Sequence, residues 1–314
     1  MSTKVKAQEK DLLPKTFRDS TYALKYIEMS TRKLDKNGVL ICKIPYSNEF
    51  FYYPIHMARY SLGNLEKYLD TKNIKNKAAF FCQVNWLFQN LVIKDGFGVW
   101  EHHYSLPYYD FNKIPWVHGL GQGLGLIVLL KAYQLTENNE YLVASKKVYR
   151  SFEVEIVDGG VRFVDDDGNV WFEEYAILPP PHVLNGFITI LFSIHEFYRV
   201  TKIETALGLW NDGIQTLKRN LNQFDIGYWS LYDLLFKYPS AKEYHAMHSW
   251  QLNLLYELTG EKIFCEYAKL WKKYTNIWIY RSQASLKRGL MHLKRYGPRG
   301  SMKRYLKQRK WKKR

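Results

Sequence analysis

Apolar residues recur at steps of three and four along most of the chain, the spacing of an amphipathic helix. The spacing is seen in the series Leu142, Ser145, Val148, Tyr149 and Phe152. The helical segments come in pairs: one apolar-periodic stretch ends near a threonine, a short polar hinge follows, and a second amphipathic stretch begins. The hinge threonines are Thr71, Thr136, Thr201 and Thr259. Four similar helix pairs predict an all-α array in which each pair packs against the next.

Three long inserts rich in aromatic residues separate the pairs, at 96–116, 155–181 and 222–248. The second carries the turn signals Asp-Gly-Gly (158–160) and Asp-Gly-Asn (167–169) around a short strand-like segment. After three prolines, a helix is expected to begin near His182. Inserts at corresponding places in successive units fall on one rim, so we predict short β-hairpin inserts there, where a site is assembled.

The charge is unevenly distributed. The chain has 46 Lys and Arg against 30 Asp and Glu, a formal charge of +16. The segment 281–314 holds 14 of the basic residues and no acidic one, so 1–280 carries 32 against 30, a net of +2. A nearly neutral body does not suit sequence-specific nucleic-acid binding. We divide the chain into an N-terminal extension (1–50), a helical domain (51–280) and a basic tail (281–314).

The basic tail has two interpretations. It is either a solvated charged segment or a peripheral anchor on anionic lipid, assisted by its apolar residues Leu286, Leu290, Leu293 and Trp311. The start of the chain lacks the apolar core of a signal peptide, and the longest apolar stretch, 183–197, is too short and polar to span a bilayer. We expect a cytoplasmic protein, with membrane association only at its periphery.

The candidate functional residues lie in the inserts and at the helix starts beside them. They are polar or aromatic: Glu173, Glu174, Tyr175, Asn185, Tyr228, Tyr232, Asp233, Tyr244, His245, His248 and Gln251. On a helix, Tyr244, His248 and Gln251 lie at i, i+4 and i+7 and form one stripe, either functional or simply solvated. The opposite face, with Met247, Trp250, Leu254 and Leu258, is then the expected core side.

Other motifs indicate no cofactor or metal. The pairs His102–His103 and His245–His248 lack an HExxH or cysteine partner, and the three cysteines are far apart. The glycines of 119–125 resemble a phosphate loop but lack a preceding buried strand and a GK[ST] ending. Close helix packing is the better explanation for them.

The chain from Tyr53 to Tyr274 resembles the C-terminal catalytic domain of the D-glucuronyl C5-epimerases, which convert glucuronic into iduronic residues in heparan-type chains. The matching segments, in family order, are YPIHMARYSL, the W…GLGQG stretch at 116–123, WFEEY…VLNGF, LYDL and YHAMHSWQL. The resemblance implies an incomplete α/α toroid, an acidic polysaccharide substrate and no redox cofactor. It also allows a homodimer.

Inversion at C5 of a uronate removes a proton from one ring face and returns one to the other through an enolate, which needs neutralising donors. The resemblance points to Glu174 or Tyr175 as one acid/base, Tyr232 as its counterpart, and Tyr244 with His248 as orienting donors. A tyrosine acts as a base only if its pKa is lowered, by cations that the sequence does not identify. The remaining implied substrate contacts are Trp116, Gln122, Asn185, His245 and Gln251.

Two features leave alternatives open. The family usually has an arginine directly after Tyr-Asp-Leu, suited to pair with a carboxylate, and this chain has Leu235 there. The β-rich region that precedes the helical domain in animal enzymes is largely absent. The alternatives are a polysaccharide lyase, which begins with the same proton abstraction, and a non-catalytic glycan-binding or assembly protein with the same toroid.

Overall fold

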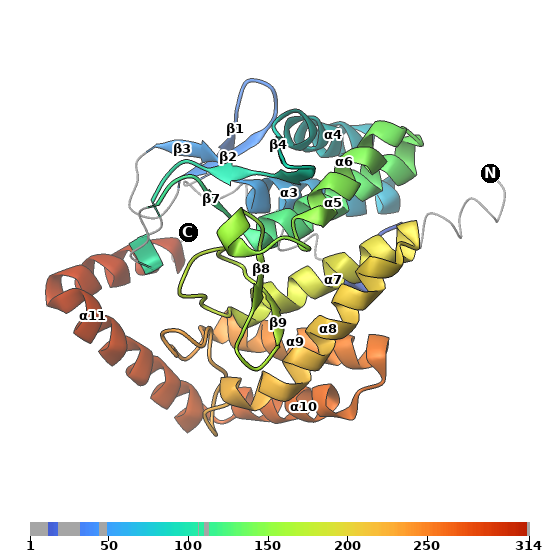
Figure 1. Cartoon of the computed structure of the whole chain (residues 1–314). Helices are drawn as coiled ribbons and strands as arrows, with labels where there is room; N and C mark the ends of the chain where they lie inside the picture. The colour runs from blue at the N-terminus through green and yellow to red at the C-terminus, as the bar shows by residue number, and fades with distance from the viewer. Residues whose placement is uncertain (1–11, 18–31, 44–48, 106, 110–112, 313–314) are drawn as a thin grey trace.

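The computed structural model describes residues 12–17, 32–43, 49–105, 107–109 and 113–312, with side chains as far as residue 297. Within them, four helix pairs form an incomplete α/α toroid, as predicted (Figure 1). The first helix of every pair has 18 residues. The pairs are α3 (Pro54–Thr71) with α4 (Ile74–Gln89), α5 (Gly119–Thr136) with α6 (Asn139–Arg150), α7 (Leu184–Thr201) with α8 (Glu204–Asn220), and α9 (Lys242–Thr259) with α10 (Lys262–Asn276).

The four hinges share one hydrogen-bonding pattern. Each first helix ends at its predicted threonine, whose hydroxyl donates to the carbonyl four residues earlier and accepts the N–H two residues later. The residue after the threonine is left-handed and stops the helix. These residues are Lys72, Glu137, Lys202 and Gly260, with φ between 57° and 72°. The repeat inferred from the sequence is confirmed.

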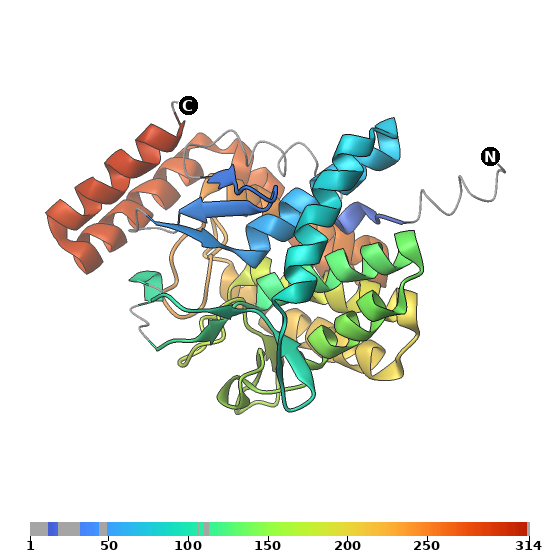
Figure 2. The ribbon, with the colours of Figure 1, turned by 90° about the horizontal axis from the view of Figure 1, so that it is seen from above.

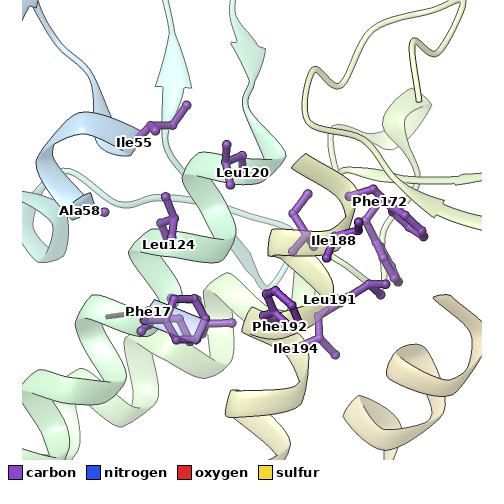
Figure 3. Packing of buried hydrophobic residues seen from close by; sticks show 14 of the residues in the cluster. Phe17, Ile55, Ala58, Leu120, Leu124, Phe172, Ile188, Leu191, Phe192 and Ile194 are labelled. Atoms are coloured by element: carbon purple, nitrogen blue, oxygen red, sulfur yellow. The ribbon is translucent and has the colours of Figure 1, made fainter. Parts of the chain in front are cut away.

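The first helices form the inner layer, and α5 and α7 lie at its centre. Most of α5 is buried, because apolar residues cover all its sides. Leu120 and Leu124 of α5 pack in the same core as Ile188 and Phe192 of α7 (Figure 3). The segment before the helical domain joins this core through Phe17, in the short helix η1 (Lys15–Phe17). The outer helices are amphipathic and cover the inner layer.

Short antiparallel strands precede α3, α5 and α7. A three-stranded sheet packs against α3, and two-stranded hairpins occupy the inserts before α5 and α7. The strands are β1 (Arg32–Leu34), β2 (Leu40–Lys43), β3 (Phe50–Tyr52), β4 (Val92–Lys94), β5 (Phe97–Val99), β6 (Glu101–His102), β7 (Trp116–Val117), β8 (Arg162–Val164) and β9 (Val170–Phe172). Short helical turns complete the inserts: η2 (Pro107–Tyr109), η3 (Ile156–Asp158) and η4 (Leu221–Phe224).

The C-terminal helix α11 (Trp278–Lys312) is broken at Gly297, where φ is 66° and ψ is 173°. Figures 1 and 2 show two arms folded back on one another beside the toroid. The first arm packs on the segment before α9: Arg288 donates to the carbonyl of Ser240 at 3.0 Å, and His292 stacks on Tyr238. None of the described helices is long and apolar enough to cross a bilayer.

Candidate active site

The inner helices all begin at one rim of the toroid, and the inserts meet there. The N-cap residue of α3, Tyr53, has its ring 5.9 Å from the ring of His118, the N-cap residue of α5. At the start of α7, the N–H of Leu184 donates to the carbonyl of Tyr232 at 3.1 Å. The first turn of α9 adds Tyr244. Four helix N-termini therefore converge, and their partial positive charge favours an anion at this rim.

Glu174 lies at the centre of this group and is 4% exposed. Strand β9 ends at Phe172 and the backbone bends at Glu174, so Glu174 and Tyr175 do not point to opposite faces as they would in a strand. The Glu174 carboxylate lies 3.8 Å from Nε2 of His118 and accepts a hydrogen bond from Nδ2 of Asn185 at 3.5 Å. The carboxylate is thus held between the starts of α5 and α7.

Burial raises the pKa of the Glu174 carboxyl to about 7, although the Arg59 charge and a hydrogen bond from the Tyr175 hydroxyl lower it. Burial also keeps the pKa of His118 well below its usual range, so this neighbour is a neutral imidazole. A carboxyl with a pKa near neutrality exchanges a proton readily in either direction. Glu174 therefore has the protonation properties of a general base.

Two tyrosines lie close to this carboxylate. The Tyr175 hydroxyl lowers the pKa of Glu174, and the Tyr232 hydroxyl lowers the pKa of Tyr175, each against the larger effect of burial. Tyr244, 37% exposed, meets Tyr232 edge to face with ring centroids 5.3 Å apart. Burial, reinforced by the Glu174 charge, raises the pKa of Tyr175 and Tyr232 well above the usual value. The condition for a tyrosine to act as a base, a lowered pKa, is therefore not met at Tyr175 or Tyr232, and both hydroxyls are neutral.

Two buried amides lie on α9 and α5. Nε2 of Gln251 donates to the carbonyl of Asn185 at 3.0 Å and to Oγ1 of Thr189 at 2.9 Å, so α9 holds the start of α7. Gln122, on α5, is 1% exposed, and within the described part of the chain neither atom of its amide has a hydrogen-bonding partner. A buried polar atom without a partner costs about 1–3 kcal/mol.

The two histidines of α9 join a different cluster. Nδ1 of His245 and Nδ1 of His248 each lie 2.8 Å from Oγ of Ser230, and the His245 ring stacks on Trp229. The predicted polar stripe of α9 is the core side, since His248 and Gln251 are both buried. The expectation for the opposite face is wrong for Trp250 and Leu258, which are more than 40% exposed, and confirmed for Leu254, which is buried.

Trp116 borders the site on its other side. Its indole N–H donates to the carbonyl of Tyr104 at 2.7 Å, and its ring lies 6.1 Å from that of Tyr175. The glycines just downstream pack closely, as predicted: a Cβ on Gly119 or Gly125 would overlap Glu173 or Trp100. The described residues include no group of three His, Cys, Asp or Glu side chains placed to hold a metal ion.

Sequence reasoning missed several residues of this site. Arg59, on α3, supplies the charge that acts on Glu174, and Tyr109 donates to Asp233 at 3.4 Å while its ring packs against Tyr175 at 5.0 Å. Burial raises the pKa of Asp233 to about 6. Arg59 lies inside the segment YPIHMARYSL, but its place on a helix carried no signal of function. Only the convergence of α3 with the second insert reveals it.

The fold and the site together define the class of protein to which this chain belongs. The architecture is that of an α/α toroid, with the site built at the rim where the inner helices begin. Solved structures with the same architecture include a glycoside hydrolase family 76 mannosidase of Bacteroides thetaiotaomicron, with a TM-score of 0.51 and 13% identity over 80% of this chain and 70% of that one. A family 76 α-mannanase of the same organism gives 0.50 and 12%, over 85% and 72%. At this identity the likeness concerns the fold alone.

The family is shown by the sequence. Residues 94–273 match the D-glucuronyl C5-epimerase C-terminus, and the chain belongs to this family. An uncharacterized protein of Methanocaldococcus jannaschii is 35% identical over 180 residues, 56% of this chain and 58% of that protein. The D-glucuronyl C5-epimerase of Caenorhabditis elegans is 28% identical over 215 residues, 62% of this chain and 35% of that enzyme. The chain thus spans less than two thirds of either relative.

Proposed function

We propose that this protein is an isomerase that inverts C5 of uronate residues in an acidic polysaccharide, of the glucuronic-to-iduronic type. The observation that carries the proposal is the buried Glu174 carboxyl, whose pKa is about 7, with the neutral hydroxyls of Tyr175 and Tyr232 close to it. The family assignment supports the same conclusion. The inversion needs a base and an acid on opposite faces of one sugar ring, and we assign these two roles to Glu174 and Tyr232.

In the proposed reaction, Glu174 takes the C5 proton from one face of the sugar and the Tyr232 hydroxyl gives a proton to C5 from the other face. The C5–H bond breaks toward Glu174, and a new C5–H bond forms from Tyr232. Tyr232 then regains a proton from Tyr175, and Tyr175 regains one from Glu174. No proton is gained or lost over the cycle, so no co-reactant is required.

The intermediate is an enolate of a carboxylate and carries two negative charges. Arg59 is the cation that acts on Glu174, and Asn185 holds an amide N–H toward the same carboxylate. The N-termini of the inner helices add partial positive charge at the same rim. These groups act on a buried site, where each is worth more than it is in water.

The test is hydrogen exchange at C5. The protein is incubated with uronate polymers, including glucuronan and unsulfated heparosan-type chains, in deuterated water, and deuterium at C5 and the ratio of the two epimers are read by NMR. Deuterium at C5 together with the inverted sugar supports the proposal. Folded protein that incorporates no deuterium into any uronate polymer contradicts it and favours a glycan-binding protein. Absorbance from an unsaturated uronate product identifies a lyase instead.

A further inference from the structure

The first arm of α11, residues 278–296, turns its most apolar side to solvent. Leu286, Leu290 and Leu293 are 65%, 57% and 44% exposed, and Ile279, seven residues before Leu286, is 47% exposed. Residues at these spacings lie on one face of a helix, and we call these four the apolar row. Single exposed leucines are ordinary, whereas a continuous apolar strip on a protein surface indicates a contact with a partner or a membrane.

The opposite face of the arm holds it against the rest of the protein. Ala284 is buried, and Arg288 donates to the carbonyl of Ser240 at 3.0 Å. The guanidinium carbon of Arg295 lies 3.7 Å from the ring centroid of Phe236. Ala284, Arg288 and Arg295 lie at i, i+4 and i+11, half a turn away from the apolar row. The arm therefore packs arginines inward and exposes leucines, the reverse of an ordinary surface helix.

Further contacts near the break at Gly297 fix this orientation. His292 stacks on Tyr238 with ring centroids 4.9 Å apart, and the hydroxyl of Tyr296 donates to the carbonyl of Tyr108 at 3.5 Å. A rotation that buried the apolar row against the protein would break these contacts. Figures 1 and 2 both show the first arm at the outer edge of the molecule, where a flat surface can reach it.

The residues that border the row indicate what covers it. Lys287 and Lys294 are exposed beside it, and Trp278, 67% exposed, lies at its start. Segment 281–314 has 14 Lys and Arg and no acidic residue. Apolar residues bordered by cations and an indole are typical of a helix that lies in the interface of an anionic bilayer. A second copy of the row, related by a twofold axis, would instead bring like charges together.

We propose that the first arm of α11 docks the protein on an anionic lipid surface, with the apolar row between the headgroups and the two lysines against the phosphates. The proposal does not rest on the proposed reaction, because no residue of the row belongs to the site. Since His292 and Tyr296 contact the inserts, docking places the rim of the toroid beside the bilayer.

Vesicle flotation of the full chain tests this docking, using phosphatidylcholine vesicles with and without phosphatidylglycerol. We expect binding to the anionic vesicles only, weakened by salt. Loss of the apolar contact should reduce binding about tenfold or more in Leu286→Gln/Leu290→Gln/Leu293→Gln. The matched control removes three comparably exposed apolar residues outside α11 and should bind normally: Ile74→Gln/Val143→Gln/Val157→Gln. Unchanged thermal unfolding shows that both variants are folded.

A second pair of variants tests the charges. Each lysine at an anionic surface contributes about fivefold in affinity, so Lys287→Gln/Lys294→Gln should bind the anionic vesicles about 10–30-fold more weakly at low salt. Lys75→Gln/Lys146→Gln removes the same charge from exposed positions on α4 and α6 and should stay within about twofold of the unsubstituted protein.

Four results overturn the proposal. They are equal binding by the leucine variant and its control, equal binding by the two lysine variants, no preference for anionic vesicles, and no vesicle binding at all. A concentration-dependent dimer that the leucine variant loses, without vesicle binding, assigns the row to a second copy of the chain. Binding to a soluble acidic polysaccharide without binding to vesicles assigns the basic residues to the polymer instead.

Discussion

Gly186 in the first turn of α7 leaves room for the Glu174 side chain to lie directly against the helix. A Cβ on Gly186 would lie 2.6 Å from the Cβ of Glu174 and closer still to its carboxylate. Glu174 packs against the backbone of α7 at this point, in the space that a side chain at position 186 would otherwise fill. The position of the proposed base therefore depends on a residue twelve positions away that has no side chain.

Gly186→Ala should displace Glu174 and lower C5 exchange by about 100-fold, since a shift of about 1 Å in a catalytic group has an effect of this size. Gly208→Ala on α8 is the matched control, because nothing lies within 4 Å of its new Cβ. It should leave exchange unchanged and stabilise the protein by up to about 1 kcal/mol through helix propensity. Exchange rates and urea unfolding of both variants check this. Normal exchange in Gly186→Ala would contradict the proposed position of the base.

Glu174→Gln should abolish exchange and stabilise the protein at alkaline pH. The folded-state pKa of about 7 lies above the ordinary value of 4.5, so the folded protein holds more protons than the unfolded chain between these two pH values. Stability from this group is fully present below pH 4.5 and is lost as the pH rises toward 7. The neutral amide escapes this loss, which is on the order of 3 kcal/mol above pH 7.

Thermal unfolding at pH 5 and pH 8 measures this difference. The variant and the unsubstituted protein should unfold at similar temperatures at pH 5, and the variant should unfold at the higher temperature at pH 8. Asp166→Asn, at an exposed position, is the control and should show no such pH dependence. A Glu174→Gln protein with lower stability at pH 8 would show that the buried carboxylate is not destabilising.

The pH dependence of the reaction follows from the same carboxyl. Glu174 must be ionised to take the C5 proton, so the rate at subsaturating polymer should rise as the pH increases through about 7. Tyr175 and Tyr232 must remain protonated, and because their pKa values are raised, the rate should not fall again near pH 10 on their account. Initial rates of C5 exchange between pH 5 and pH 9 measure the rise. A flat profile is the opposing result.

Tyr232→Phe should separate exchange from inversion. The variant keeps Glu174, which can still take the C5 proton and return a deuteron to the same face, but it lacks the hydroxyl on the other face. We expect labelled sugar of unchanged configuration, with inversion reduced by about 10²–10⁴-fold. Tyr256→Phe, an exposed tyrosine on α9, is the control. Loss of labelling and inversion to the same extent would instead assign the abstraction itself to Tyr232.

Thr201→Val tests the hinge pattern. The threonine hydroxyl donates to the carbonyl of Phe197 at 2.8 Å and accepts the N–H of Ile203 at 3.3 Å, and valine keeps the shape without either hydrogen bond. We expect a loss of about 1–2 kcal/mol in the free energy of unfolding, measured in urea, with normal exchange at C5. An unchanged unfolding midpoint would show that the hinge bonds do not stabilise the repeat.

Local patterns account for what could be predicted. The helix pairs, the hinge threonines and the hairpin turns depend on residues that are close in sequence, and all were recognisable. The faces of α9 were not, because the expected core side was judged from the apolar Trp250 and Leu258. In the structure, Nδ1 of His248 bonds to Ser230 and Nε2 of Gln251 bonds to Asn185, and these polar side chains are buried instead.

Periodicity and turn chemistry are local, so the all-α repeat, the rim that holds the inserts and the segment that contains Glu174 and Tyr175 could be predicted from the sequence. Which charges act at this rim depends on how the chain folds. Arg59 comes from the first helix of the toroid and Arg295 from the basic tail, and folding brings both to the aromatic residues of the inserts. Burial at that meeting point sets the pKa of Glu174, and burial depends on segments far apart in the chain.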